Sequence, residues 1–178
     1  MWQLAAALIE IALRRRGPDA LPDSSFLVFF LLAVEILATL AAIVVNGGVT
    51  GTILILLAAD TALFFSFVFA VLSFFRLERR YRQTVSAMLG ANIVVLIVYL
   101  PVALGALALG VDLNETPMLV VRYVLYYWGV FIGGSVLARS LSQPLIVGLM
   151  FEMLYVLTYE GIADFVSPPQ DVAITENA

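Results

Sequence analysis

The chain has 178 residues, of which 63% are hydrophobic and only 12% charged, and its net charge is −4. Soluble domains carry about 45–50% apolar and about 25% charged residues, so this composition excludes a water-soluble globular domain and indicates an integral membrane protein. The sequence contains no cysteine and no histidine. Disulfides, thiolate or imidazole metal sites, and catalysis by a cysteine nucleophile or a histidine base are therefore excluded, and we expect no cofactor.

Residues 1–16 begin with an apolar stretch that is too short to cross a bilayer. Its positive charges, Arg14, Arg15 and Arg16, follow the apolar stretch, whereas a secretory signal carries them before it. The polar helical face expected here holds Gln3, Ala7, Glu10 and Arg14. We therefore expect an amphipathic helix lying in the membrane interface. The alternative is a flexible apolar lead-in that docks on the rest of the protein.

Five further apolar runs are each long enough for a transmembrane helix, which needs about 20 predominantly apolar residues. The expected spans are residues 24–45, 51–75, 84–109, 118–138 and 144–165. Because the connecting segments are short, we expect consecutive spans to be antiparallel neighbours within one membrane domain, residues 17–165. The predicted fold class is thus an all-α integral membrane protein, a five-transmembrane-helix bundle with an N-terminal amphipathic interfacial helix.

The final residues, 166–178, include Pro168 and Pro169 and have little apolar content, so we expect a disordered acidic tail. Orientation follows from the arginines, because short basic loops stay on the cytoplasmic side of a membrane. Eight of the nine arginines share one side if the N-terminus is cytoplasmic, and Arg122 alone falls near the other. We therefore expect a cytoplasmic N-terminus and an extracytoplasmic C-terminus. The use of arginine without lysine is typical of a GC-rich bacterial genome, so the membrane we expect is a bacterial inner membrane.

Polar residues inside the predicted spans form the first candidate site, because a charge near the bilayer centre costs at least about 2.5–3.5 kcal/mol on insertion scales. Glu35, Asp60 and Glu152 lie on three different spans and are accompanied by Arg122 and Asn92. One interpretation is a proton or cation path, since intramembrane carboxylates commonly serve as proton relays. At about 1.5 Å of rise per residue, Asp60 and Arg122 fall at similar depths, which makes an ion pair between them reasonable.

The other interpretation of these carboxylates is structural. Glu35 and Glu152 would then be neutral and hydrogen-bonded to neighbours, holding helices together at about 0.6–2 kcal/mol per contact. The neighbours considered are Thr39, Asn92, Tyr126 and Tyr155. Carboxylates spread over three helices show no spacing that a pump demands, so the sequence favours the structural interpretation.

Small residues at helical spacing mark predicted packing faces, because small side chains let helix backbones approach closely in lipid. The residues assigned to helix packing are Ala58, Ala62, Ser66 and Ala70 on the second span, and Gly129 and Gly133 on the fourth. We expect most of these contacts to lie within the bundle. The alternative is an interface with a second subunit.

An aromatic cluster on the fourth span comprises Tyr123, Tyr126, Tyr127 and Trp128. This cluster is denser than an interfacial belt needs. It fits either core aromatics, which are the commoner case, or the lining of a ligand cavity.

The arginines expected on the cytoplasmic side form a second candidate site. Basic residues near an anionic membrane surface gain about 1 kcal/mol each, although the same charges also set topology. The residues assigned to lipid or partner contact are Arg14, Arg15, Arg16, Arg76, Arg79, Arg80 and Arg82. We expect the lipid bilayer as the environment, other membrane subunits or a second copy as further partners, and no nucleic acid.

The five-span layout and the segment Gly17-Pro18 with Leu21-Pro22-Asp23-Ser24 resemble the Yip family of Ypt/Rab-interacting membrane proteins and its bacterial relatives. An acidic-leucine pair often precedes the Gly-Pro in that family, and Arg14-Arg15-Arg16 stands there instead. The resemblance implies a non-enzymatic helical membrane protein. Eukaryotic members act in membrane trafficking through GTPase partners, but they typically have a long cytoplasmic N-terminal region that is not expected here, so we do not expect a Rab-binding role.

The function expected from the sequence is therefore that of a non-enzymatic accessory or scaffolding component that acts by partner or lipid binding. The alternative is a proton- or cation-coupled transporter or channel subunit that uses Glu35, Asp60 and Glu152, with Arg122 as counter-charge.

Overall fold

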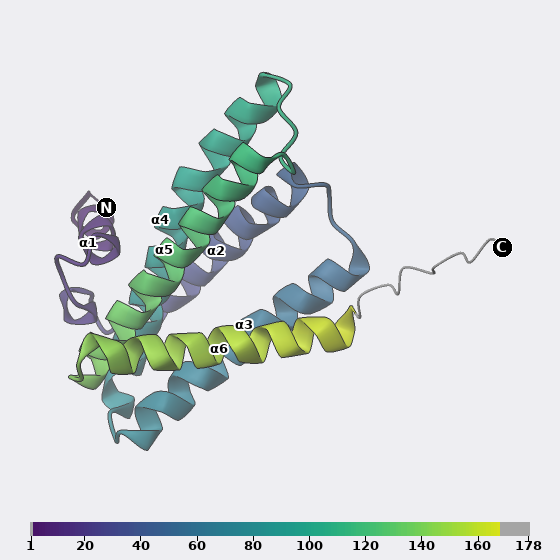
Figure 1. The fold of residues 1–178 in the computed structure, drawn as a ribbon. Helices are drawn as coiled ribbons and strands as arrows, with labels where there is room; N and C mark the ends of the chain where they lie inside the picture. The colour runs from purple at the N-terminus through teal and green to yellow at the C-terminus, as the bar shows by residue number, and fades with distance from the viewer. Residues whose placement is uncertain (1, 168–178) are drawn as a thin grey trace.

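The computed structural model describes residues 2–167, and all regular structure in that range is helical (Figure 1). A short helix, α1 (Trp2–Ala12), and a 3-10 turn, η1 (Pro18–Ala20), precede the long helices. The long helices are α2 (Ser25–Val45), α3 (Gly51–Phe74), α4 (Tyr81–Ala108), α5 (Thr116–Leu141) and α6 (Leu145–Val166), with a second 3-10 turn, η2 (Glu78–Arg80), before α4. All five are long and apolar enough to cross a membrane. The predicted fold class is confirmed.

The helix bounds lie within three residues of the expected spans. Ser24 and Thr50 cap α2 and α3 by accepting bonds from the backbone N–H of Leu27 and Ile53, at 3.4 and 3.2 Å. Differences of three residues occur at the start of α4, which begins at Tyr81, and at the end of α5. Helix α5 continues to Leu141 because Arg139 is exposed and does not interrupt the backbone hydrogen bonds. Of the predicted acidic tail, residues 168–178 lie outside the described residues.

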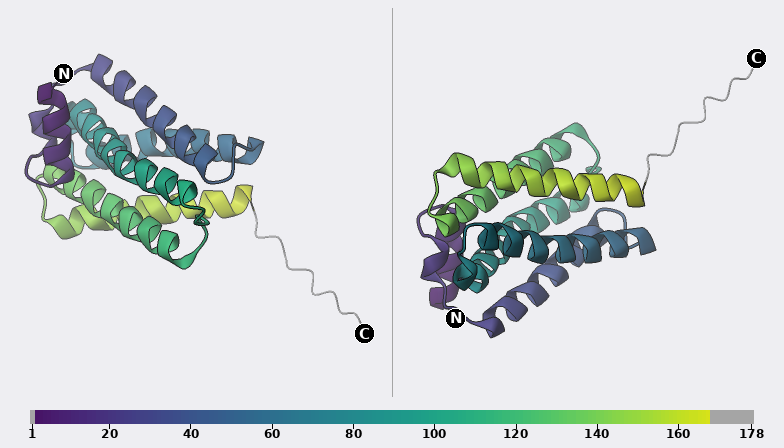
Figure 2. Two further views of the ribbon diagram at one scale, coloured as in Figure 1. Left: turned by 90° about the horizontal axis from the view of Figure 1, so that it is seen from above. Right: turned by 90° about the horizontal axis from the view of Figure 1, so that it is seen from below.

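The long helices form two groups that cross at one end and diverge toward the other (Figures 1 and 2). In the first group, α4 packs against both α2 and α5. Half of the most apolar stretch of α4 is buried, against 6–28% in the other long helices, so α4 is the central helix. The second group is the pair α3 and α6, which is joined to the first mainly by α6 packing along α5.

The consecutive helices α2 and α3 make at most marginal contact, so the expectation that all consecutive spans are packed neighbours is wrong. The linker between them contains Gly47 and Gly48 with φ of 131° and 102°. Only glycine adopts such angles readily, and this linker lets α3 leave α2 at a wide angle (Figure 1).

The backbones of α5 and α6 come into direct contact where the two helices cross. A Cβ atom on Gly148 would overlap the backbone of Gly134 and Ala138, and one on Gly134 would lie 3.0 Å from the Cα of Leu149. The absence of side chains at these two glycines lets the backbones touch, as expected for small residues in membrane helices. Sequence reasoning missed Gly148.

The main hydrophobic core lies at the end of the bundle where α1 sits. Its fully buried side chains come from several elements and include Ile11, Leu21, Leu72, Val85 and Leu137. At the opposite end there is only a small cluster formed by Tyr99, Ala103, Leu113 and Met118. The bundle is therefore closed at the α1 end and more loosely packed toward the other.

Helix α1 lies across the ends of the long helices, as both views of Figure 2 show. Its Leu8 packs directly over Gly90 of α4, while Ile9 and Leu13 point outward at 48% and 51% exposure. Ala7, expected on the polar face, is buried against the bundle, because its small side chain permits close approach. The helix is thus docked on the bundle and still exposes apolar side chains.

Candidate functional site

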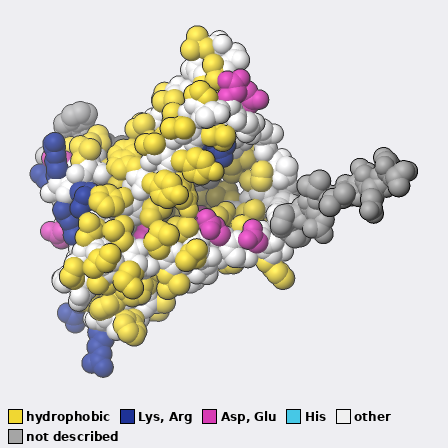
Figure 3. Space-filling view, in the orientation of Figure 1, with side chains coloured by type: hydrophobic (Ala, Val, Ile, Leu, Met, Phe, Trp, Pro, Cys, Tyr) yellow, Lys and Arg dark blue, Asp and Glu magenta, His cyan; other side chains and the backbone are white. Residues whose placement is uncertain are grey.

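A cavity of about 740 Å³ lies between the two helix groups, in the half of the bundle away from α1. All five polar residues that the sequence singled out inside the spans line it: Glu35, Asp60, Asn92, Arg122 and Glu152. Each of the five long helices contributes to its wall. In Figure 3 the surface is hollowed between the two groups, with acidic side chains along the lower edge and a basic one at the upper edge.

The polar side of α6 faces this cavity. Glu152, Tyr155, Tyr159 and Glu160 all line it, and their spacing of three, seven and eight residues from Glu152 puts them on one helical face. Tyr159 and Glu160 were not among the predicted site residues. The helical periodicity running on from Glu152 is the sequence signal that could have found them.

Glu35 is tied to neighbouring polar groups. Its Oε1 accepts a hydrogen bond of 2.8 Å from the Asn92 amide on α4 and one of 3.1 Å from the Thr39 hydroxyl on its own helix. Both partners were among the neighbours considered for a structural role. Glu35 therefore links α2 to α4.

Asp60 of α3 accepts a hydrogen bond from the Tyr155 hydroxyl of α6. Within residues 2–167 the ion pairs are Arg16 with Glu10 and Arg82 with Asp23, so the ion pair considered between Asp60 and Arg122 does not form. The reason is that α3 and α5 belong to different helix groups, on opposite sides of the cavity (Figure 1).

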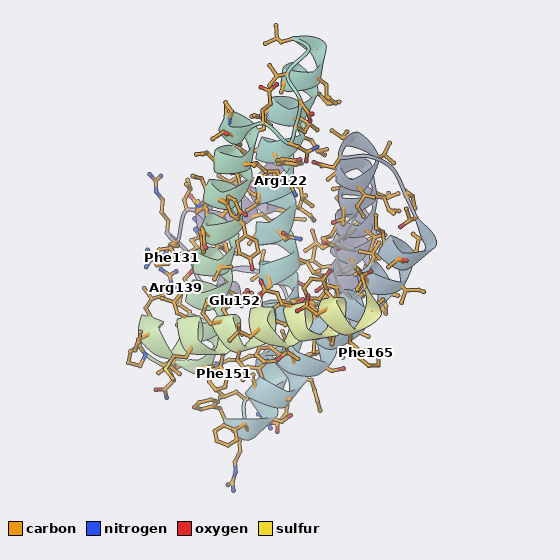
Figure 4. The ribbon with its side chains drawn as sticks, turned by 45° about the vertical axis from the view of Figure 1, so that its right-hand side comes forward. Arg122, Phe131, Arg139, Phe151, Glu152 and Phe165 are labelled. Carbon is orange, nitrogen blue, oxygen red and sulfur yellow. The ribbon has the colours of Figure 1, made fainter. Side chains whose placement is uncertain are left out.

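Glu152 differs from the other two carboxylates because it is buried without a partner. The residue is 8% exposed, and its buried Oε2 has no hydrogen-bond partner among the described residues. Neither Tyr126 nor Tyr155, the predicted neighbours, bonds to it. Figure 4 shows Glu152 on the side of α6 toward α5, away from Phe151.

The fourth-span glycines shape the space around Glu152. A Cβ atom on Gly133 would overlap the Glu152 carboxylate, whereas one on Gly129 would meet nothing within 4 Å. Both glycines line the cavity. The pair predicted for helix packing thus makes room for a buried carboxylate and for the cavity itself, while Gly134 and Gly148 bring the helices together.

The predicted packing face of α3 points outward. Ala58, Ala62, Ser66 and Ala70 are all exposed, so the expectation that they pack within the bundle is wrong. Ala58 and Ala62 instead line a shallow groove of about 420 Å³ between α2 and α3. The reason is the wide angle between these helices, which leaves this face of α3 uncovered.

Of the aromatic cluster on α5, Tyr123 and Tyr126 line the cavity. Trp128 packs against the main core, and Tyr127 is 63% exposed. The cluster therefore includes cavity-lining residues, a core residue and, at Tyr127, an exposed residue that has neither of the roles considered.

Several of the predicted lipid-contact arginines hold the protein together. Arg80 donates to the backbone oxygen of Ser140 at 2.7 Å and to Ser142 Oγ at 2.9 Å. Arg16 and Arg82 lie 2.5 and 3.6 Å from the carboxylates of Glu10 and Asp23. Arg14 lies over the ring of Phe131, with Cζ 4.3 Å from the ring centroid.

Three other arginines, Arg15, Arg76 and Arg79, are exposed, and their side chains make no hydrogen bond or ion pair with another described residue. Arg139, which was not assigned to this site, donates at 2.6 Å to the backbone oxygen of Arg14 and so holds the segment after α1.

These features define the class: a helical membrane protein with five membrane-spanning helices and an acidic intramembrane cavity. No protein-family model matches the sequence, and the comparisons with curated proteins and with solved structures give no match either.

Proposed function

We propose that this chain is a small polytopic membrane protein that binds a proton or a cation in the intramembrane cavity, as a transporter or channel subunit. One observation carries the proposal: carboxylates from three helices, Glu35, Asp60 and Glu152, line the same cavity. Each costs several kcal/mol inside a bilayer. With Glu160 the cavity holds four carboxylates against one arginine, Arg122, a balance that favours a positive ligand.

Access to the cavity supports transport rather than a sealed structural site. Toward α1 the space ends at the main core, where Ile132, Val136 and Leu137 are at most 1% exposed. Toward the other end the helix groups diverge (Figure 2). A polar cavity between two helix groups, near the middle of the spans, is where transporters commonly bind their substrates and coupling ions.

The proposed orientation has the α1 end in the cytoplasm. The arginines that follow α1, those in and beside η2, and Arg139 near the end of α5 gather at that end, and in Figure 3 the basic side chains lie mostly on the side of α1. Basic segments are retained in the cytoplasm. The cavity would then open to the extracytoplasmic side, in our proposal of a bacterial inner membrane.

The test is proton flux into proteoliposomes that contain a pH-sensitive dye. The wild-type chain and Glu115→Gln, which removes an exposed carboxylate outside the cavity, are expected to conduct or exchange protons. Glu152→Gln is expected to lose at least about 90% of the flux, because an amide cannot release a proton to the cavity. Gel filtration checks that each variant is folded. Equal flux in wild-type and empty liposomes would contradict the proposal.

A second candidate is the accessory or scaffolding role, without enzymatic activity, which the Yip resemblance also implies. What favours it is the exposed small-residue face of α3 beside the shallow groove that Ala58 and Ala62 line. Such a face lets another helix approach closely in lipid. The test is a nanodisc pull-down with mass analysis, in which Ala62→Leu should release a bound subunit and Ile55→Leu, an exposed position outside this groove, should not.

A further inference from the structure

Resting on the proposed cation-binding function, we propose that the ligand of the cavity is an organic cation with an apolar body, and that its binding displaces a proton from Glu152. Three features of the site support this ligand class: the size of the cavity, the apolar and aromatic side chains of its wall, and the burial of Glu152 without a partner among the described residues.

The cavity is far larger than an inorganic ion needs. Its volume of about 740 Å³ falls in the range of about 300–1,000 Å³ that is typical of sites for small organic ligands. Much of the wall is aliphatic, with contributions from Leu32, Met88, Leu96, Leu119 and Val156. These side chains favour a ligand with an apolar body, because burying that surface is favourable.

An inorganic cation would need several oxygen ligands converging on one point. Among residues 2–167, no group of three or more aspartate and glutamate side chains could hold a metal ion. Asp60 bonds to Tyr155, and Glu35 bonds to Thr39 and Asn92. The carboxylates therefore make the cavity acidic without forming a metal cage.

Aromatic rings stand beside these carboxylates. Phe64, Tyr123, Tyr126, Tyr155 and Tyr159 all line the cavity, and Phe64 packs edge-to-face on Tyr155, with centroids 6.4 Å apart. Tyr155 in turn donates to Asp60. Ring faces attract cations, and aromatic side chains are used to recognise quaternary ammonium groups. Rings beside carboxylates therefore favour an organic cation as the ligand.

Glu152 provides the group that a cation would neutralise. It is 8% exposed, lines the cavity and has an unpartnered Oε2 among the described residues. Gly133 of α5 touches Glu152, and Arg122 lies eleven residues before Gly133 on the same helix. At about 1.5 Å of rise per residue, this separation is about 16 Å along α5. Figure 4 likewise shows Arg122 and Glu152 well separated along the bundle. Arg122 therefore cannot pair with Glu152.

A buried carboxyl group without a counter-ion is stable only while it holds its proton. When an organic cation enters, the O–H bond of Glu152 breaks and the proton leaves to water at the open end of the cavity. The carboxylate that remains pairs with the cation. One positive charge enters and one leaves, so the net charge of the site does not change.

The experiment is equilibrium dialysis of the purified full chain in detergent against radiolabelled tetraphenylphosphonium, with protein-free micelles as the blank. We expect saturable binding of one cation per chain, release of one proton per cation in weakly buffered solution, and affinity that falls about tenfold for each unit of pH below the midpoint of the exchange. Glu152→Gln should weaken binding at least about tenfold, and Glu115→Gln should leave it unchanged.

A second pair of variants keeps the test decisive if Glu152→Gln does not fold. Phe64→Leu removes a ring from the cavity and should weaken binding several-fold, whereas Phe69→Leu, an exposed position on the same helix outside the cavity, should not. Proton flux with no tetraphenylphosphonium binding would overturn this inference and leave the proposed function standing. Absence of both flux and binding would overturn both, and binding without proton release would overturn the role of Glu152.

Discussion

Glu35 and Glu152 are the same residue type, both lie inside spans and both line the same cavity, yet their surroundings differ. Glu35 accepts bonds from Thr39 and Asn92, so its place is fixed by partners on two helices. Glu152 is held instead by close packing against Gly133, which leaves an oxygen without a partner. A buried polar group without a partner calls for an explanation, and of these two described carboxylates Glu152 is the one that meets that description.

The different roles of the two carboxylates predict different responses to substitution. Glu35→Gln should leave the free energy of unfolding nearly unchanged, because the amide oxygen of glutamine can still accept both hydrogen bonds. Glu35→Leu should cost about 1–2 kcal/mol, because Asn92 and Thr39 lose their acceptor. Thermal unfolding in detergent measures both. If glutamine destabilises as much as leucine, the charge of Glu35 matters more than its hydrogen bonds.

At the scale of elements, the contact between α5 and α6 joins the two helix groups. Gly134 and Gly148 allow it by bringing the backbones into direct contact. Because apolar side chains gain nothing by leaving lipid for protein, this close packing takes the place of the hydrophobic effect. The crossing thus sets the angle at which α3 and α6 leave the other helices, and with it the width of the cavity.

Two alanine substitutions on α6 should therefore have opposite effects. Gly148→Ala places a methyl group against the backbone of α5 and should cost about 1–3 kcal/mol through overpacking. Gly161→Ala meets nothing within 4 Å and should stabilise the helix by up to about 1 kcal/mol. Unfolding in SDS titrations measures both, and a destabilising Gly161→Ala of similar size would show that helix propensity is not the deciding factor.

Across the whole molecule, the arginines and the tightest packing are found at the same end of the bundle. The well-packed end carries α1 and most arginines, and the diverging half carries the cavity and the acidic loop between α4 and α5. N-terminal helix α1 and the end of α6 lie at opposite ends of the bundle (Figure 2). An odd number of spans requires this, and the arginine distribution predicts which end faces the cytoplasm.

This orientation can be tested directly because the protein contains no cysteine. In intact cells, Asn114→Cys in the α4–α5 loop should react with a membrane-impermeant maleimide, while Arg79→Cys in η2 should react only after the membrane is opened. Both positions are exposed, so unequal labelling reports the side of the membrane. Labelling of Arg79→Cys alone in intact cells would reverse the proposed orientation.

Much of this protein could be predicted from sequence because the strongest signals were local. Apolar length placed the spans, and the cost of polar groups in lipid singled out Glu35, Asp60, Asn92, Arg122 and Glu152, all of which line one cavity. The predictions that were wrong concerned which faces of the helices pack against each other. Ala58 and Ala62 had the spacing of a packing face and point outward, whereas Gly148 had no repeating pattern and lies directly against the backbone of α5.

The sequence by itself determined that the chain crosses a membrane five times, because each span must satisfy its own backbone hydrogen bonds in lipid and is long enough to do so. Only the tertiary structure decided that α3 diverges from α2, that Asp60 pairs with Tyr155 rather than Arg122, and that Glu152 is buried without a partner. Apolar helices in lipid have no hydrophobic face to hide. Their relative rotation and angle therefore depend on contacts between residues far apart in the chain.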